Sequence, residues 1–448
     1  MISKLVAKLK NKHFLSLAAN GSMTVFSMIT VGLLYRSLTA IDNGLWIFFQ
    51  SAYVLLDTFR TGFLQTAIIK FYSGAEDNRA NEVMGSTWFL GSAITTFFLA
   101  LSIPAWFILP YIDISGIQII IKWFAVTFLF SLPNCLAFWS LQAKQQFDKL
   151  LYIRIINQGS FIIFIVIFLY TEKLNLETTL LSNLIGCLIT SLVCLFFGWT
   201  EIKSFSKRSK TCIKELFNFG KYSVGTTIGA NLLRSSDTFI INFTLGPAAL
   251  AVYNLATRLL EIIEFPLRSF LATGMPALSN AFNQNKRSEV ANILKKYAGL
   301  LTISLVPVSI VAIILADVGI GLLGGGKYTH TEAANIYRIL MLFAIFYPIE
   351  RFMGITIDIV NQPKMNLLKI FLMLTVNVIG DFIGIYFLGN IYGIALASLL
   401  PILVGMFFGF WILRKHLDFS ILGILSTGIT EIKLLFQNLQ SKKRKIYH

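Results

Sequence analysis

The sequence predicts an all-α polytopic membrane protein, and two observations lead to this prediction. Of the 448 residues, 56% are hydrophobic and only 13% are charged, whereas soluble globular domains carry about 25% charged residues. The hydrophobic residues also gather in runs long enough for spanning helices, which need about 20 residues each. A soluble multidomain protein is therefore excluded. The net charge of +16 then needs an explanation other than nucleic-acid binding, and no nucleic-acid partner is expected.

About twelve windows of spanning length follow one another along the chain. The expected helices lie near residues 14–36, 45–69, 83–109, 117–141, 151–170, 178–199, 217–244, 250–282, 298–322, 333–360, 366–388 and 391–413. Short polar segments separate them.

The basic residues predict the orientation of these helices, because Lys and Arg gather on the cytoplasmic side of a membrane. They are frequent at both termini and after every second helix. The richest such segment is 201–215, and the tenth connection has Lys364 and Lys369. The remaining connections have few basic residues. We therefore predict a multi-pass protein with both termini in the cytoplasm. Within the C-terminal region, residues 421–439 place Ile421, Leu425 and Ile432 on one face, which predicts a helix lying on an anionic leaflet.

The two halves of the chain resemble one another. Leu38 to Trp46 aligns without gaps with Leu245 to Tyr253, and farther along Asp57 aligns with Glu264. The predicted architecture is two homologous six-helix lobes around a central cavity, the MATE-like or flippase fold. The expected parts are an N-lobe over 1–200, a basic cytoplasmic linker over 201–215, a C-lobe over 216–414 and a cytoplasmic amphipathic basic tail over 415–448.

Charged residues within the membrane are the main functional signal, because they usually face a cavity or one another. They concentrate in the helices near 45–69, 217–244 and 250–282. The residues expected to line the cavity are Arg60, Arg234, Arg258, Arg268, Asn231, Gln50 and Tyr53. The acidic residues beside them are Asp57, Asp237, Glu261 and Glu264. Several of these charges are spaced as i,i+3 or i,i+4 pairs, so mutual structural pairing is an open alternative.

The sequence predicts neither an enzyme nor a metal site. The four Cys and four His residues are scattered without metal-ligand spacing. Prolines interrupt four of the expected helices at Pro133, Pro266, Pro307 and Pro348. They can act as hinges of a transporter or as ordinary kinks.

Several short segments resemble a known family. Asn43-Gly44-Leu45-Trp46 follows the first helix, and further matching segments are 141–147, 234–241, 245–246, 251–256, 361–364 and 393–398. Together they resemble the polysaccharide-transport branch of the multidrug/oligosaccharidyl-lipid/polysaccharide flippase superfamily, of the O-antigen type. Ala251 and Asn361-Gln362 depart from the family pattern, where Gly and Gly-Lys are usual.

This resemblance implies a transporter of the bacterial inner (plasma) membrane. It would flip undecaprenyl-pyrophosphate-linked oligosaccharide to the outer leaflet by alternating access, for surface polysaccharide or lipopolysaccharide assembly. The cavity arginines would meet the pyrophosphate. The acidic residues Asp57, Asp237, Glu261 and Glu264 would couple transport to H⁺ or Na⁺, with no other cofactor. The implied partners are the lipid-linked oligosaccharide, membrane lipids and the glycan polymerase or ligase machinery.

Three alternatives compete with this interpretation. A multidrug or cation antiporter of the same superfamily would share the fold and would need an aromatic-lined pocket. A glycan polymerase or ligase would need a long catalytic segment outside the membrane, which the expected connections do not provide. A lipid II-type flippase usually has two additional helices.

Overall fold

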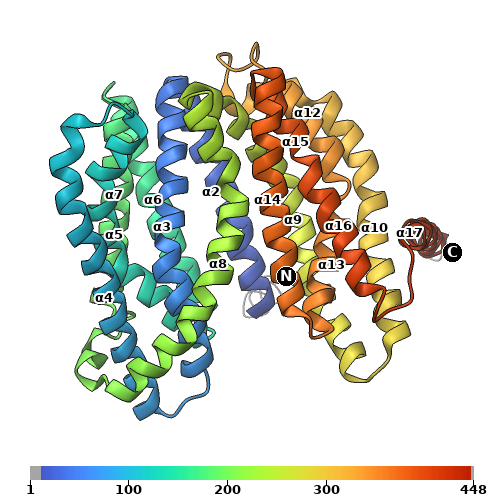
Figure 1. The fold of residues 1–448 in the computed structure, drawn as a ribbon, viewed down its shortest axis with the longest axis horizontal. Helices are drawn as coiled ribbons and strands as arrows, with labels where there is room; N and C mark the ends of the chain where they lie inside the picture. Colours follow the sequence, from blue (N-terminus) through green and yellow to red (C-terminus); the bar gives the residue numbers. More distant parts are fainter. Residues whose placement is uncertain (1–11, 445–448) are drawn as a thin grey trace. The chain divides into compact units, whose positions relative to one another are not determined.

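In a computed structural model the described residues are 12–444, and every regular element among them is helical (Figure 1). The first half contains α2 (Lys12–Ser37), α3 (Ala40–Tyr72), α4 (Asp77–Ile108), η1 (Leu109–Tyr111), α5 (Ser115–Ala143), α6 (Phe147–Tyr170), α7 (Leu176–Phe196) and η2 (Ile202–Lys207). The second half contains α8 (Lys210–Thr244), α9 (Pro247–Asn283), α10 (Arg287–Ile314), α11 (Ala316–Gly324), α12 (Ala333–Ala344), α13 (Tyr347–Ile359), α14 (Pro363–Leu388), α15 (Ile391–Ala397), α16 (Leu399–Leu413) and α17 (Ile421–Arg444).

The predicted spans coincide with helices, but three of them are divided. The segment expected as one helix over 298–322 consists of the end of α10 and the separate α11. The segment over 333–360 consists of α12 and α13, which are bent by 49°. Pro348 lies in the first turn of α13, where its missing N–H interrupts the helical hydrogen bonds. A break at Ser398 divides the last span into α15 and α16.

The helices identify a multi-pass membrane protein. Within the described part of the chain, seven helices are long and apolar enough to cross a membrane, and the bent pair α12 and α13 would be an eighth span. The long helices α3, α8 and α9 fall outside that set. They contain most of the charges that the sequence places at membrane depth, and these charges lower their hydropathy.

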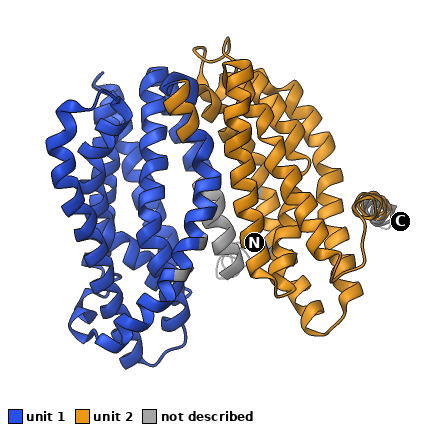
Figure 2. Ribbon diagram, in the orientation of Figure 1, with its two compact units in different colours: residues 1–238, 246–251 blue, residues 239–245, 252–448 orange. Residues whose placement is uncertain are grey.

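The chain divides into two compact units (Figure 2). Unit 1 consists of residues 1–238 and 246–251, and unit 2 consists of residues 239–245 and 252–448. The sequence repeat places a lobe boundary at the linker 201–215, whereas by packing most of α8 belongs to unit 1. The first turn of α9 also belongs to unit 1, because a Cβ on Gly44 would lie 1.8 Å from the Pro247 carbonyl oxygen. Nearby, the Tyr35 hydroxyl donates to the carbonyl oxygen of Ala251 at 3.0 Å.

The linker after α7 is packed against unit 1. A Cβ added to Gly85 in α4 would lie 2.1 Å from the carbonyl oxygen of Ser204 in η2, so the two backbones are in direct contact. The Trp88 indole N–H donates to the carbonyl oxygen of Thr200 at 2.8 Å. The basic segment expected as a linker therefore forms an ordered layer on the end of α4.

An ion pair fixes the start of this linker to neighbouring helices. The Lys144 ammonium lies 2.7 Å from a carboxylate oxygen of Glu201, and the Tyr72 hydroxyl donates to the same carboxylate at 3.0 Å. Burial alone would lower the pKa of Lys144, but its contacts with Glu201 and Tyr72 outweigh that effect and raise this pKa above its usual value. The linker is thus tied to the ends of α3 and α5.

Unit 2 has its main apolar core among α10, α13, α16 and α17. Leu294 and Ala298 of α10, Phe352 of α13 and Ile424 of α17 belong to one buried cluster. Since α17 contributes a fully buried residue to this cluster, the C-terminal helix is part of the packed structure of unit 2. Ile421 and Leu425, which were expected to face a leaflet, pack against this protein core instead.

Candidate functional site

An ion pair with a fully buried arginine lies at the centre of the polar residues in unit 1. Asp57 and Arg60 are one turn apart in α3, and an Nη2–Oδ1 distance of 2.6 Å joins them. The Arg60 side chain is 0% exposed. An isolated charge at such a position would be very costly, so the guanidinium needs further partners.

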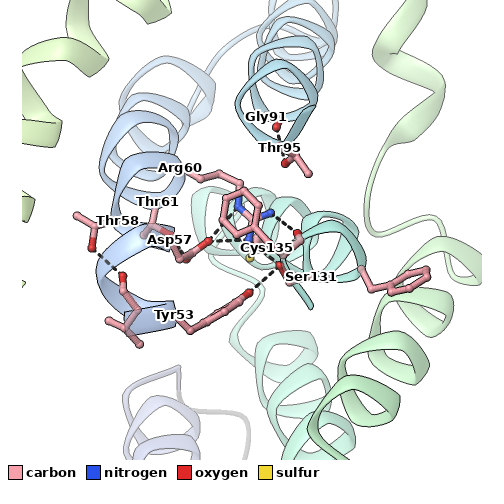
Figure 3. A network of polar contacts seen from close by, with 12 residues as sticks. Tyr53, Asp57, Thr58, Arg60, Thr61, Gly91, Thr95, Ser131 and Cys135 are labelled. Carbon is pink, nitrogen blue, oxygen red and sulfur yellow. Dashed lines mark hydrogen bonds and ion pairs between the residues drawn. The ribbon is translucent and has the colours of Figure 1, made fainter. Parts of the chain in front are cut away.

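Helix α5 supplies those partners (Figure 3). Arg60 donates from Nη1 to the Phe128 carbonyl oxygen at 2.9 Å and from Nη2 to the Ser131 hydroxyl at 2.6 Å. The guanidinium carbon lies 4.0 Å from the centre of the Phe128 ring, a cation–π geometry. Arg60 therefore joins α3 to α5. The sequence gives no direct signal for Ser131, because a lone serine in an apolar helix is common.

Two further hydroxyls complete this network. The Tyr53 hydroxyl donates to Ser131 at 2.8 Å, and the Thr61 hydroxyl donates to the second carboxylate oxygen of Asp57 at 2.6 Å. Gln50, one turn before Tyr53 on α3, is half-buried. Of the four predicted site residues on α3, Gln50, Tyr53, Asp57 and Arg60, the last three are joined by contacts inside unit 1.

Helix α8 approaches the same region of α3. The Asn231 side-chain amide donates to the Thr58 hydroxyl at 2.6 Å. One turn farther along α8 Arg234 is exposed, and about one turn beyond it Asp237 is half-buried. Among the predicted site residues of unit 1, Arg234 is therefore the basic one that is accessible.

In unit 2 the charged face of α9 forms two ion pairs. Arg258 lies 3.1 Å from Glu261, and both side chains are about one-third exposed. Arg268 lies 2.7 Å from Glu264, with 61% of the arginine side chain exposed. These are the i,i+3 and i,i+4 pairs that the spacing allows. Because the pairs are partly exposed, their arginines can also contact a second anion.

Unit 2 also contains a buried ion pair that the sequence analysis did not predict. The Lys369 ammonium donates to a Glu350 carboxylate oxygen at 2.7 Å, and both side chains are at least nine-tenths buried. The sequence counts Lys369 among the basic residues of a connection, but the structure places it inside α14. The available signal was Glu350, an acid at membrane depth that needs a cation beyond its neighbour Arg351, which lies 3.7 Å away.

The described residues contain no group of three or more His, Cys, Asp or Glu side chains placed to hold a metal ion. The charged residues of the two units therefore fall into two groups, which differ in their accessibility. Arg60 and both members of the pair Glu350–Lys369 are buried and bound to protein partners, and Asp57 is half-buried, whereas Arg234, Arg258 and Arg268 are accessible. The accessible arginines are suited to binding an anion with several oxygen atoms.

Comparison with known families shows a match over most of the chain. The sequence profile of the family described as "Polysaccharide biosynthesis protein" matches residues 9–282. The profile described as "MatE" matches residues 223–383. A curated relative is the "Probable low-salt glycan biosynthesis flippase Agl15" of Haloferax volcanii, 24% identical over 237 residues, which are 53% of this chain and 49% of the relative. The chain thus spans about half the length of this relative.

Solved structures share the fold. An inward-facing MATE-family multidrug resistance transporter of the MOP superfamily superposes with a TM-score of 0.72 and 14% identity, covering 88% of this chain and 94% of that chain. The lipid II flippase MurJ in an inward closed conformation superposes with a TM-score of 0.73 and 16% identity, covering 95% of this chain and 92% of that chain. These similarities confirm the predicted all-α MATE-like fold.

Proposed function

The chain belongs to the polysaccharide biosynthesis protein family, and we propose that it flips an undecaprenyl-pyrophosphate-linked oligosaccharide across a bacterial inner membrane. Transport runs from the cytoplasmic to the outer leaflet and supplies surface polysaccharide or lipopolysaccharide assembly, such as O-antigen. The product passes to a glycan polymerase or ligase. Both termini lie in the cytoplasm, as the distribution of Lys and Arg predicts. The similarity to the probable glycan biosynthesis flippase of Haloferax volcanii supports this proposal.

One observation carries the proposal: accessible arginines lie on the long, charge-containing helices α8 and α9. A pyrophosphate presents several oxygen atoms, and guanidinium binds such groups with two parallel hydrogen bonds. Arg234, Arg258 and Arg268 are the residues that we assign to this contact, with Asn231 and Gln50 beside the path. Arg60 and Tyr53 support the path from inside unit 1, since their polar atoms already have protein partners.

The acidic residues of the same helices are the candidates for ion coupling. Glu261 and Glu264 each lie beside an arginine that we assign to the substrate. When the substrate anion occupies those arginines, the carboxylates lose their partners and gain affinity for H⁺ or Na⁺. Asp237 and Asp57 are included as coupling candidates, and Asp57 would act while bound to Arg60. Alternating access, which the internal repeat favours, would join the two events.

The proposal is tested in a deletion strain complemented with Arg234→Ala or Arg258→Ala. We expect surface glycan to be lost and lipid-linked oligosaccharide to accumulate on the cytoplasmic leaflet, with normal protein in the membrane. Arg338→Ala is the matched control, because Arg338 is also partly exposed but pairs with Asp317 at 2.5 Å outside the assigned path. Normal export by both Arg234→Ala and Arg258→Ala contradicts the assigned path.

The match of the MatE profile to residues 223–383 favours a second candidate function, multidrug or cation antiport. This function predicts unchanged surface glycan in the deletion strain together with reduced tolerance of cationic drugs. The same strain therefore separates the two functions.

A further inference from the structure

The C-terminal helix α17 has three chemically different sides. Its inner side packs on α10, where a Cβ on Gly299 would lie 2.1 Å from the Ile424 carbonyl oxygen. This close crossing buries Ile424 completely. An ion pair of 2.9 Å between Lys296 and Glu431 lies beside it. The inner side thus fixes α17 across α10 at one level.

That level is the boundary of the membrane core. Lys295 and Lys296 are the last charged residues of α10, because residues 297–314 contain none. Gly299 follows Lys296 by three residues, or about 4.5 Å along a helix. The crossing therefore lies just inside the point where α10 becomes wholly apolar, which is the depth of an interfacial helix.

The end of α16 marks the same boundary independently. Trp411 is half exposed, and the Lys415 ammonium lies 3.7 Å from its ring centre. Tryptophan beside lysine is typical of the membrane–water interface. Since α17 begins at Ile421, only a short connection separates it from this marker.

The two outer sides of α17 differ in polarity. Leu422 is 78% exposed and Ile429 is 46% exposed, and helical geometry places them within about 20° of each other. Ser426 and Thr430 form the adjoining polar side and are also exposed. Lys433 is exposed at the border between the two sides. A helix with an apolar side, a water side and lysine at their border matches the headgroup layer of a bilayer.

The charges specify the kind of lipid. The helix contains Lys433, Lys442, Lys443 and Arg444, against the single acid Glu431, which is already paired with Lys296. We propose that α17 is a lipid-binding element of unit 2. Leu422 and Ile429 enter the acyl layer, and the net positive charge of the helix attracts anionic phospholipid. The inference concerns the membrane surface and does not depend on which substrate is transported.

The test uses the full-length protein in vesicles of phosphatidylcholine, with or without phosphatidylglycerol. A nitroxide is attached at Leu422→Cys, and its accessibility to oxygen and to a water-soluble nickel complex is measured. We expect oxygen to dominate in the anionic vesicles. The matched control is Ser426→Cys, one turn farther along on the polar side, where the nickel complex should dominate. Treating the wild-type chain with the same nitroxide reagent measures any labelling of its own cysteines, which are buried or half-buried.

Replacing lysines of α17 by glutamine tests whether the helix binds anionic lipid or is only buried in the bilayer. Each of Lys433→Gln, Lys442→Gln and Lys443→Gln should weaken docking of the Leu422 label about fivefold in anionic vesicles. Raised salt should weaken wild-type docking in the same direction. The control is Lys214→Gln, which removes an exposed charge from α8 in unit 1 and should change nothing.

Three outcomes would overturn the proposal. In the first, the Leu422 label faces water in both kinds of vesicle. In the second, docking is equally strong in neutral vesicles. In the third, the label is inaccessible to both reagents, which means that protein rather than lipid covers this side of α17.

Discussion

Lys369 and Glu350 form a 2.7 Å ion pair inside unit 2, although they lie on different helices and are separated by nineteen positions in the chain. The pair holds α14 against α13 just after the bend in the broken span. The Lys369 ammonium also lies 2.8 Å from the position that a Cβ on Gly354 would occupy. A side chain larger than hydrogen at Gly354 would push the ammonium away from the carboxylate.

Removing one member of this pair should destabilise the protein strongly. Lys369→Met leaves the Glu350 carboxylate buried with little compensation, at a cost of about 3–5 kcal/mol. The measurement is the thermal unfolding midpoint in detergent. Lys364→Met is the control, because Lys364 is exposed near the start of the same helix. The double change Lys369→Met with Glu350→Leu should recover part of the loss. Equal midpoints for Lys369→Met and Lys364→Met would contradict the assigned role.

Arg60 should tolerate no replacement by lysine, even though the charge is kept. A lysine has no planar fork, so it cannot serve Asp57, the Phe128 carbonyl and Ser131 together. The expected loss is about 1.5–3 kcal/mol for hydrogen bonds to a charged group. The comparison is Arg338→Lys, whose partly exposed pair with Asp317 should change stability by less than about 0.5 kcal/mol. A similar small loss at Arg60 would show that the network contributes little.

Gly44 should be restricted to glycine by its contact with α9. In Gly44→Ala the new Cβ would overlap the Pro247 carbonyl oxygen at 1.8 Å, so the two segments must separate. We expect a lower unfolding midpoint, because the separation would also weaken the hydrogen bond from the Tyr35 hydroxyl to the Ala251 carbonyl oxygen. Gly159→Ala in α6 is the matched control, since nothing lies within 4 Å of its Cβ position. That change should be neutral or stabilising by about 0.5–1 kcal/mol.

The docked linker predicts slow proteolysis at its basic residues. Gly85→Leu should force η2 away from α4, because the added side chain meets the Ser204 backbone. Trypsin should then cleave at Lys203, Lys207 and Arg208 several times faster than in the wild type. Gly225→Ala, on α8 with nothing within 4 Å of its Cβ position, should leave the rate unchanged. An unchanged rate in Gly85→Leu would mean that the linker is held by other contacts.

The sequence predicts the helical class, because hydrophobic runs of spanning length have few alternative folds. It also identifies which helices are polar, since Asp57, Arg258 and Glu264 stand out in apolar surroundings. The local pairs Asp57–Arg60 and Arg258–Glu261 follow from helical spacing alone.

Contacts between distant segments are a different matter. Lys369 looks like a boundary residue until α14 is known to begin at Pro363. Likewise, the docking of η2 depends on Gly85 meeting Ser204, and hydropathy does not encode a backbone contact between segments so far apart. The sequence also does not predict that most of α8 packs with unit 1. An internal repeat shows that two segments have a common origin, and it does not show which segments are in contact.

The composition of unit 1 has a consequence for biosynthesis. Chains emerge from the ribosome N-terminus first, and their domains generally form in that order. All residues of unit 1 lie at or before position 251. Its last piece is the first turn of α9, which meets Tyr35 and Gly44, residues synthesised much earlier. Every residue of the N-terminal unit has therefore been synthesised before translation reaches α10.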